Sequence, residues 1–349
     1  MRFCVIVGTR PQIIKSQPII KELLSRRSNL TMIHTGQHYD YQMSKIFFEE
    51  MKIRDPDLNL EVDPGTAAQQ LASIIQKLEK PLQKISPDIV IIPGDTRSAL
   101  GAALCANRLG IKVAHVEAGA RSMEFEMEEE INRRIIDHIS SLLFAPTQNC
   151  YKNLKKESVF GSVFLTGDTM YDVFLQFKKN LKPNKSSGKY VLMTLHRNDN
   201  IKNYQKIKKI LNLAKQISAK GWDVIFPIHP HTKKQIRTFG LGLNGITATN
   251  PIKYSDTLRL LRGASLLLTD SGGLQKEAYW LNTPCVTLRK STEWIETLDG
   301  KHNFLHSNIS DSSVNFVTKI LKQKRLSTKP TTKFGNGEAA KKIASILLQ

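Results

Sequence analysis

Short apolar runs alternate with longer segments of helical periodicity in the first half of the chain. The runs are rich in Val, Ile and Leu, which is typical of strands buried on both faces. The predicted strands are Phe3–Val7, Thr31–Thr35, Ile89–Pro93, Val113–Glu117 and Leu142–Ala145. The predicted helices are Ile13–Leu24, Met43–Met51, Ala67–Lys84, Ser98–Leu109 and Glu130–Ser140. This alternation predicts a parallel sheet with right-handed crossovers, the doubly wound α/β class.

A second alternating series follows a polar, lysine-rich segment at Lys178–Lys189, which we interpret as a linker. Its predicted strands are Tyr190–Leu195, Val224–Ile228, Ile246–Ala248, Ser265–Thr269 and Cys285–Leu288. We therefore expect two Rossmann-like domains, at 1–180 and 190–335, and a final helix within 336–349 that packs back on the N-terminal domain. Ligands of such folds bind at the carboxyl ends of the strands, so we expect a central cleft between the domains.

The 349 residues suffice for two such domains, and their positive charge is unevenly distributed. Residues 1–170 carry 21 basic and 20 acidic side chains, whereas residues 171–349 carry 30 and 11. A solvated lysine-rich surface explains this excess, but the excess also raises the local potential for phosphates, nucleic acid or a membrane surface. Aromatic residues make up only 7% and are not interleaved with the basic ones, which disfavours stacking on single-stranded nucleic acid. We expect no nucleic-acid partner.

Several classes of protein are excluded by what the sequence lacks. No apolar run reaches 18 residues, and the amino terminus does not resemble a signal peptide, so we expect a cytoplasmic protein without membrane insertion. The four cysteines are far apart, which argues against disulfides and zinc knuckles. There is no HExxH motif and no GxGxxG motif after a strand. We therefore expect neither a metal nor another cofactor.

Glycine-containing turns follow two of the predicted strands. Gly8-Thr9-Arg10-Pro11 follows the first strand, and Arg10 and Lys15 could cradle an anion at the start of the next helix. Asp270-Ser271-Gly272-Gly273 opens the helix Leu274–Leu281, where free backbone N–H groups suit a phosphate and Glu277 could reach a ribose. The alternatives are an ordinary strand-to-helix turn and a helix capped by Ser271 or Asp270.

Carboxylates follow other predicted strands of the first half. Asp95 and Glu117 lie at strand ends, where a buried carboxylate is costly unless it is paired or used. Glu129 and Arg133 are four residues apart and share a helical face. For any single carboxylate a cap or a surface ion pair is the simpler interpretation, but three acidic clusters after strands of one domain favour a site with several carboxylates.

Histidines follow the first two strands of the basic half. His196 is placed where an imidazolium could stabilise charge on a departing phosphate, and His229 and His231 follow the next strand. A lone histidine is more often a satisfied polar residue. Two histidine positions after strands of an electropositive half weaken that interpretation.

Taken in order, these motifs resemble the non-hydrolysing UDP-N-acetylglucosamine 2-epimerase family over nearly the whole chain. The matching segments are Gly8-Thr9-Arg10-Pro11 with Lys15, Thr35-Gly36-Gln37-His38, Gly94-Asp95-Thr96, Val116-Glu117-Ala118-Gly119, Glu129-Glu130-Ile131-Asn132-Arg133, His196-Arg197 with Asn200, and Asp270-Ser271-Gly272-Gly273 with Glu277. The resemblance implies a glycosyltransferase-B-like arrangement, a UDP-sugar substrate, a homodimer and a role in polysaccharide biosynthesis.

The resemblance also implies the chemistry, which is inversion at C2 of UDP-GlcNAc to give UDP-ManNAc. UDP is eliminated with loss of the C2 proton, and it adds back to a 2-acetamidoglucal with protonation on the opposite face. The catalytic residues implied are Asp95, Glu117, Glu129, Arg133 and His196. The substrate-binding residues implied are Arg10, Lys15, His38, His229, Ile252, Thr257, Ser271, Gly272, Gly273, Glu277 and Arg289.

Some positions depart from the commoner members of the family. Trp294 replaces a nucleotide-contacting arginine. Gln12, Lys276 and the segment Thr292-Glu293-Trp294 look more like the branch that acts on UDP-2,3-diacetamido-2,3-dideoxy-glucuronate. Epimerisation of that sugar is therefore the alternative function. A glycosyltransferase of the same two-domain build and a non-catalytic nucleic-acid binder are more remote alternatives.

Overall fold

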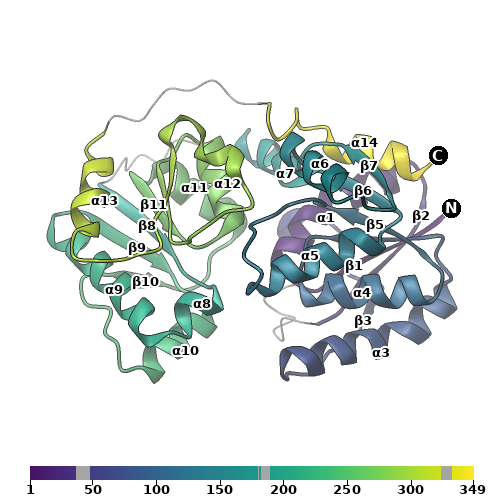
Figure 1. Ribbon diagram of the computed structural model, residues 1–349, viewed down its shortest axis with the longest axis horizontal. Helices are drawn as coiled ribbons and strands as arrows, with labels where there is room; N and C mark the ends of the chain where they lie inside the picture. The colour runs from purple at the N-terminus through teal and green to yellow at the C-terminus, as the bar shows by residue number, and fades with distance from the viewer. Residues whose placement is uncertain (37–47, 180, 182–188, 324–331) are drawn as a thin grey trace. The chain divides into compact units, whose positions relative to one another are not determined.

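The computed structural model describes residues 1–36, 48–179, 181, 189–323 and 332–349. These residues divide into two compact units, Met1–Lys179 with Thr332–Gln349 and Asn180–Thr331. Each unit is a parallel sheet covered by helices on both faces (Figure 1), which confirms the predicted α/β class of two doubly wound domains. The predicted helix Met43–Met51 lies largely outside the described residues.

The first unit contains a seven-stranded sheet in the order β3-β2-β1-β4-β5-β6-β7. Its strands are β1 (Arg2–Val7), β2 (Asn29–His34), β3 (Leu58–Asn59), β4 (Ile89–Pro93), β5 (Lys112–Val116), β6 (Leu142–Ala145) and β7 (Ser162–Leu165). Its helices are α1 (Arg10–Ser25), α3 (Ala67–Ile85), α4 (Arg97–Arg108), α5 (Glu128–Ile139), α6 (Gln148–Lys156), α7 (Thr169–Lys178) and α14 (Ala339–Leu347). The strands before β1 in the sheet order lie on one side of it and β4 lies on the other, so the strand order reverses between β1 and β4. Ligands of such sheets bind at this switch point, beside the loops that follow the two strands.

The second unit repeats this plan with a six-stranded sheet in the order β10-β9-β8-β11-β12-β13. Its strands are β8 (Tyr190–Thr194), β9 (Asp223–Pro227), β10 (Thr247–Thr249), β11 (Leu266–Thr269), β12 (Cys285–Thr287) and β13 (Asn303–Leu305). Its helices are α8 (Asn198–Ile201), α9 (Tyr204–Ala219), α10 (Pro230–Thr238), α11 (Tyr254–Gly263), α12 (Gly272–Trp280), the 3₁₀ helix η1 (Ile295–Lys301) and α13 (Ser313–Leu321). Here the reversal falls between β8 and β11.

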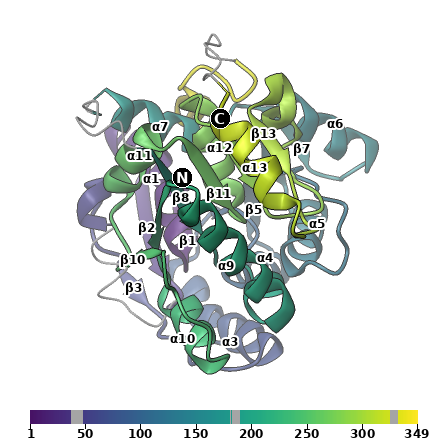
Figure 2. The ribbon, with the colours of Figure 1, turned by 90° about the vertical axis from the view of Figure 1, so that its left-hand side faces the viewer.

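Apolar side chains on both faces of each sheet build the cores. In the first unit, α1 and α14 pack on one face against Phe3, Val5 and Phe144, and α3 and α4 pack on the other against Cys4 and Ile6. In the second unit, α9 and α13 share one face, nearest the viewer in Figure 2, and α11 and α12 cover the other. This two-sided burial explains why the strands appear in the sequence as continuous apolar runs.

The carboxyl-terminal helix α14 packs on α1 and α7 and is anchored by one buried carboxylate. Asp172 accepts hydrogen bonds from the backbone N–H groups of Ala339 (3.2 Å) and Ala340 (2.8 Å), which have no partner within the helix. Burial raises the pKa of Asp172 to about 6, and the two N–H groups oppose that rise.

Replacing Asp172 by alanine should therefore lower the free energy of unfolding by about 1 kcal/mol, because two buried N–H groups lose their acceptor. Urea unfolding followed by circular dichroism measures the change. Glu338→Ala, at the exposed position just before α14, is the control and should have a smaller effect. Equal losses in the two variants would show that Asp172 does not anchor the helix.

Candidate functional site

The predicted site residues of the first unit converge on the carboxyl ends of β1, β4 and β5. Gln12, in the first turn of α1, accepts a hydrogen bond from Gly8 N–H (2.9 Å) and donates one to the carbonyl of Pro93 (2.9 Å). The turn after β1 is thereby joined to the turn after β4. Thr9 is the N-cap of α1, Pro11 lies in its first turn, and the helix begins three residues before the predicted start at Ile13.

Glu117 directly follows β5 and has an unusual backbone conformation. Its φ angle is +73°, in the left-handed region that non-glycine residues seldom adopt. Its carboxylate contacts Lys15 Nζ at 2.6 Å, and both side chains are about nine-tenths buried. Lys15, which the sequence groups with Arg10 as a possible anion cradle, is thus held against a carboxylate. A strained, paired carboxylate at a strand end is a typical feature of an active site.

Asp95 lies in the neighbouring turn and contacts an arginine from α5. The guanidinium of Arg133 reaches the Asp95 carboxylate at 2.5 Å and Glu130 at 3.3 Å. Asn132 donates to the Asp95 carbonyl at 2.9 Å. Helix α5 therefore fixes both ends of Asp95. Glu129, predicted to belong to this set, is half-buried one position before the fully buried Glu130.

The sequence motifs did not identify two buried residues, His115 and Asp137, that support these turns. The buried side chains of His115 and Asp137 contact each other at 2.6 Å, directly behind the turns that carry Asp95 and Glu117. A histidine inside the apolar run Val113–Val116 is the signal that could have identified the first of them. For Asp137, which lies in an otherwise ordinary amphipathic helix, the sequence holds no comparable signal.

In the second unit, Asp270 organises the turns that follow β8 and β11. It is fully buried and accepts hydrogen bonds from the backbone N–H of His196 (3.1 Å), the backbone N–H of Arg197 (3.0 Å) and Nδ2 of Asn200 (3.1 Å). Its carboxylate also lies 3.2 Å from His196 Nδ1. Burial alone would raise the pKa of this carboxyl, but His196 and the N–H donors lower it to about 2. Asp270 therefore positions the half-exposed imidazole of His196.

Ser271, rather than Asp270, is the N-cap of α12, and its hydroxyl accepts from Leu274 N–H at 3.3 Å. Gly272 and Gly273 follow it. A Cβ at Gly272 would lie 2.5 Å from Glu293 Oε1, so glycine is required for the close approach of the neighbouring loop. Arg289 contacts Glu293 at 2.6 Å. Glu277 is buried in α12, and the Lys276 ammonium lies 3.8 Å from the centroid of the Trp294 ring.

The other predicted binding residues lie at or near the starts of helices, except for His38. His229 is the N-cap of α10, and Thr257 is buried in the first half of α11. Ile252 lies two residues before α11 and is half-buried. Arg10 begins α1. His38 lies outside the described residues.

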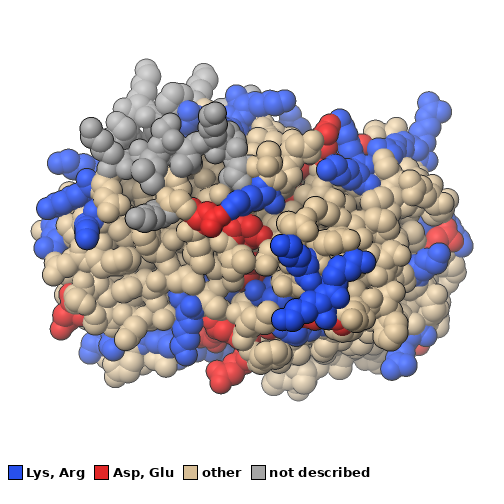
Figure 3. Space-filling model, turned by 45° about the horizontal axis from the view of Figure 1, so that its top comes forward, with Lys and Arg blue, Asp and Glu red and all other residues tan. Residues whose placement is uncertain are grey.

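Metal-binding groups, membrane-spanning helices and surface charge are the other features that bear on function. No group of His, Cys, Asp and Glu among them has the geometry of a metal site, and none of their helices is long and apolar enough to cross a membrane. On the face drawn in Figure 3, Lys and Arg side chains form separate groups divided by uncharged surface and by acidic side chains.

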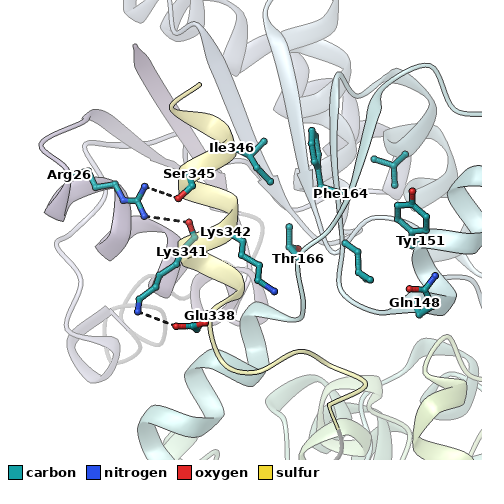
Figure 4. A pocket seen from close by; sticks show the side chains of 12 residues that line it. Arg26, Gln148, Tyr151, Phe164, Thr166, Glu338, Lys341, Lys342, Ser345 and Ile346 are labelled. Carbon is teal, nitrogen blue, oxygen red and sulfur yellow. Dashed lines mark hydrogen bonds and ion pairs between the residues drawn. The ribbon is translucent and has the colours of Figure 1, made fainter.

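A surface cavity of about 800 Å³ lies beside the edge strand β7 and α14 (Figure 4). Its walls include Tyr151, Thr166 and Lys342, and Arg26 donates to the hydroxyl of Ser345 at 3.0 Å beside it. None of the predicted site residues lines this cavity. It is therefore separate from the candidate catalytic groups.

Comparison with known proteins identifies the family of this chain. A family model described as UDP-N-acetylglucosamine 2-epimerase matches residues 21–348. The chain belongs to this family. The expectation from the sequence motifs, an epimerase of UDP-sugars, is thereby confirmed at the level of the family.

Individual relatives and solved structures cover the whole chain. It is 41% identical to a UDP-N-acetylglucosamine 2-epimerase of Methanococcus maripaludis, covering 98% of this chain and 97% of the relative. It is 35% identical to a UDP-2,3-diacetamido-2,3-dideoxy-D-glucuronate 2-epimerase of Pseudomonas aeruginosa, covering 99% of each. The crystal structure of the Methanocaldococcus jannaschii UDP-GlcNAc 2-epimerase with UDP-GlcNAc and UDP matches with a TM-score of 0.93 and 40% identity, over 100% of this chain and 99% of that one.

Proposed function

We propose that this chain interconverts UDP-GlcNAc and UDP-ManNAc by eliminating UDP and adding it back. The observation that carries the proposal is the pair of turns at the switch point of the first sheet, where Glu117 and Asp95 are held by Lys15 and Arg133. Relatives that are UDP-GlcNAc 2-epimerases share 40–41% of their residues with this chain over nearly its full length.

In the proposed elimination, a carboxylate removes the proton from C2 while the bond from C1 to the diphosphate oxygen breaks. The electron pair of the C2–H bond becomes the C1=C2 double bond of 2-acetamidoglucal, and UDP leaves as an anion. In the return step the diphosphate oxygen attacks C1, and a proton is delivered to the other face of C2. Asp95, Glu117 and Glu129 form the acid–base set, because proton removal and return on opposite faces need more than one group.

We assign the leaving nucleotide to the second unit. The N–H groups that open α12 at Ser271, Gly272 and Gly273 suit the diphosphate oxygens, and Glu277 suits the ribose. His196, oriented by Asp270, supplies positive charge as negative charge develops on the diphosphate. The site as proposed needs no metal and no cofactor.

Incubation with UDP-GlcNAc in deuterium oxide, followed by proton NMR, tests the reaction. We expect UDP-ManNAc to form and the C2 hydrogen of both sugars to be replaced by deuterium. Retention of the C2 hydrogen during turnover would exclude elimination through C2. A glycosyltransferase would leave the UDP-sugar unchanged without an acceptor, so the same spectrum separates the two reaction classes.

The second candidate substrate is UDP-2,3-diacetamido-2,3-dideoxy-glucuronate. The buried Lys276, which faces the ring of Trp294, favours it, because these two positions look more like the branch that acts on this sugar. A parallel incubation with this substrate compares kcat/KM for the two sugars. A higher kcat/KM for the uronate would reassign the substrate without changing the reaction.

The remaining parts of the proposal concern context. We propose a cytoplasmic homodimer that supplies activated sugars for polysaccharide biosynthesis. Light scattering after size-exclusion chromatography tests the oligomeric state, since a dimer doubles the 39.4 kDa mass of the chain.

A further inference from the structure

His115 is a buried polar residue in the middle of β5. Its Nδ1 lies 2.6 Å from Asp137 Oδ1, and its Nε2 lies 2.9 Å from the carbonyl oxygen of Gly94. His115 is 1% exposed and Asp137 is 0% exposed. Both ring nitrogens are therefore committed to protein partners.

The nature of those partners sets the hydrogen-bonding roles of the two ring nitrogens. Burial alone would raise the pKa of the Asp137 carboxyl, but His115 and Arg121 hold it below its usual range, so Asp137 is an anion. A carboxylate and a carbonyl oxygen can only accept hydrogen bonds, so both ring nitrogens must carry a hydrogen. Asp137 is bound by this ring at 2.6 Å and by Arg121 at 2.7 Å.

These buried side chains are bonded to the two turns that carry the candidate acid–base residues. His115 fixes the carbonyl of Gly94, the residue immediately before Asp95. Asp137 Oδ2 accepts from the N–H of Gly119 at 3.1 Å, two residues after Glu117. The second turn is strained at Glu117, whose φ is +73°, so it persists only where surrounding contacts hold it.

We propose that His115 and Asp137 are positioning residues that hold Asp95 and Glu117 in their reactive geometry, an inference that rests on the proposed function. Neither residue is placed to touch the sugar. Well-packed apolar side chains would stabilise the interior of this sheet as well as a buried ion pair does. The His115 and Asp137 pair instead gives two directed bonds, one to each turn, which apolar side chains could not supply.

His115→Gln tests the proposal, because glutamine has one amide group and cannot donate to both Asp137 and Gly94. We expect kcat to fall by about 10- to 100-fold, while KM and the dissociation constant of UDP change by less than about threefold, since a small displacement of reacting groups affects the transition state most. Activity is expressed per UDP-binding site, so that unfolded protein is not counted.

Asp172→Asn is the matched control, because it changes a buried carboxylate of the same unit that is bonded to α14 and not to these turns. It should lower stability and leave kcat per UDP-binding site unchanged. If His115→Gln behaves in the same way as this control, the positioning role is wrong. If the wild-type protein itself exchanges no C2 hydrogen, the proposed function fails instead.

A measurement on the wild-type protein avoids dependence on a folded variant. With ¹⁵N-labelled histidine, each ring nitrogen of His115 should show a hydrogen, because both face acceptors. A ring with one proton in the wild-type protein would overturn the proposal.

Discussion

Replacing Glu117 by glutamine should lower kcat by about 10²-fold or more, while the dissociation constant of UDP changes by less than about twofold. Glutamine has nearly the same shape and can still accept from Lys15, but its amide cannot take up the C2 proton or return one. The proposed nucleotide-binding residues belong to the other unit, so UDP binding should be retained. Steady-state kinetics and titration calorimetry measure the two quantities.

Glu22→Gln is the control for this change, because Glu22 lies on α1 in the same unit and makes an ion pair with Arg26 at 3.6 Å. It should leave kcat unaltered. Asp95→Asn should behave like Glu117→Gln, although the loss of charge beside Arg133 adds a cost in stability. Normal turnover in both catalytic variants would remove these carboxylates from the mechanism.

The second large effect is expected for Asp270→Asn. This carboxylate is fully buried and accepts from the backbone of His196 and Arg197 and from Asn200, so an amide would place N–H groups against existing donors. Each buried N–H group left without an acceptor costs about 1–3 kcal/mol of unfolding free energy. We also expect at least tenfold weaker UDP binding, because Ser271 and Gly272 follow directly and His196 loses its orienting partner.

The pH dependence of stability gives an independent check on Asp270. Its pKa of about 2 in the folded protein lies below the value of about 3.9 for an unfolded aspartate, so the folded state binds a proton less readily. The stabilisation is therefore complete above about pH 4 and is lost as the pH falls toward 2. Urea unfolding from pH 2 to pH 7 should show this acid-side slope in the wild-type protein and a shallower one in Asp270→Asn.

Asp223→Asn serves as the control, because Asp223 is an exposed residue at the start of β9. It should retain the wild-type slope and affinity for UDP. An Asp270 variant with wild-type stability and UDP affinity would contradict the role we assign to this residue.

Most of the strands that the sequence predicted have apolar runs that are easily recognised. Three short edge strands, β3, β7 and β13, were missed, whereas the fourth edge strand, β10, was predicted as Ile246–Ala248. A final helix within 336–349 was predicted and occurs as α14 (Ala339–Leu347).

At the site, the motifs identified the residue types and the turns but not the partners. Lys15 and Arg10 were grouped as an anion cradle, and the structure instead places Lys15 on Glu117. Ser271 and Asp270 were treated as alternative caps. In the structure Ser271 is the cap, and Asp270 is a buried acceptor of several N–H groups. Pairings of this kind join residues about 40 to 100 positions apart, such as Arg133 with Asp95 and Lys15 with Glu117.

Local sequence therefore determined the fold class, the strand-end positions of the acidic and glycine-containing turns, and the family, because each depends on short-range periodicity or on residues close together in the chain. Only the tertiary structure decided which charges neutralise one another and which backbone is strained. The left-handed conformation of Glu117 and the contacts at both ring nitrogens of His115 arise where β4, β5 and α5 pack together. The sequence does not reveal them, because a residue's neighbours in a parallel sheet come from distant parts of the chain.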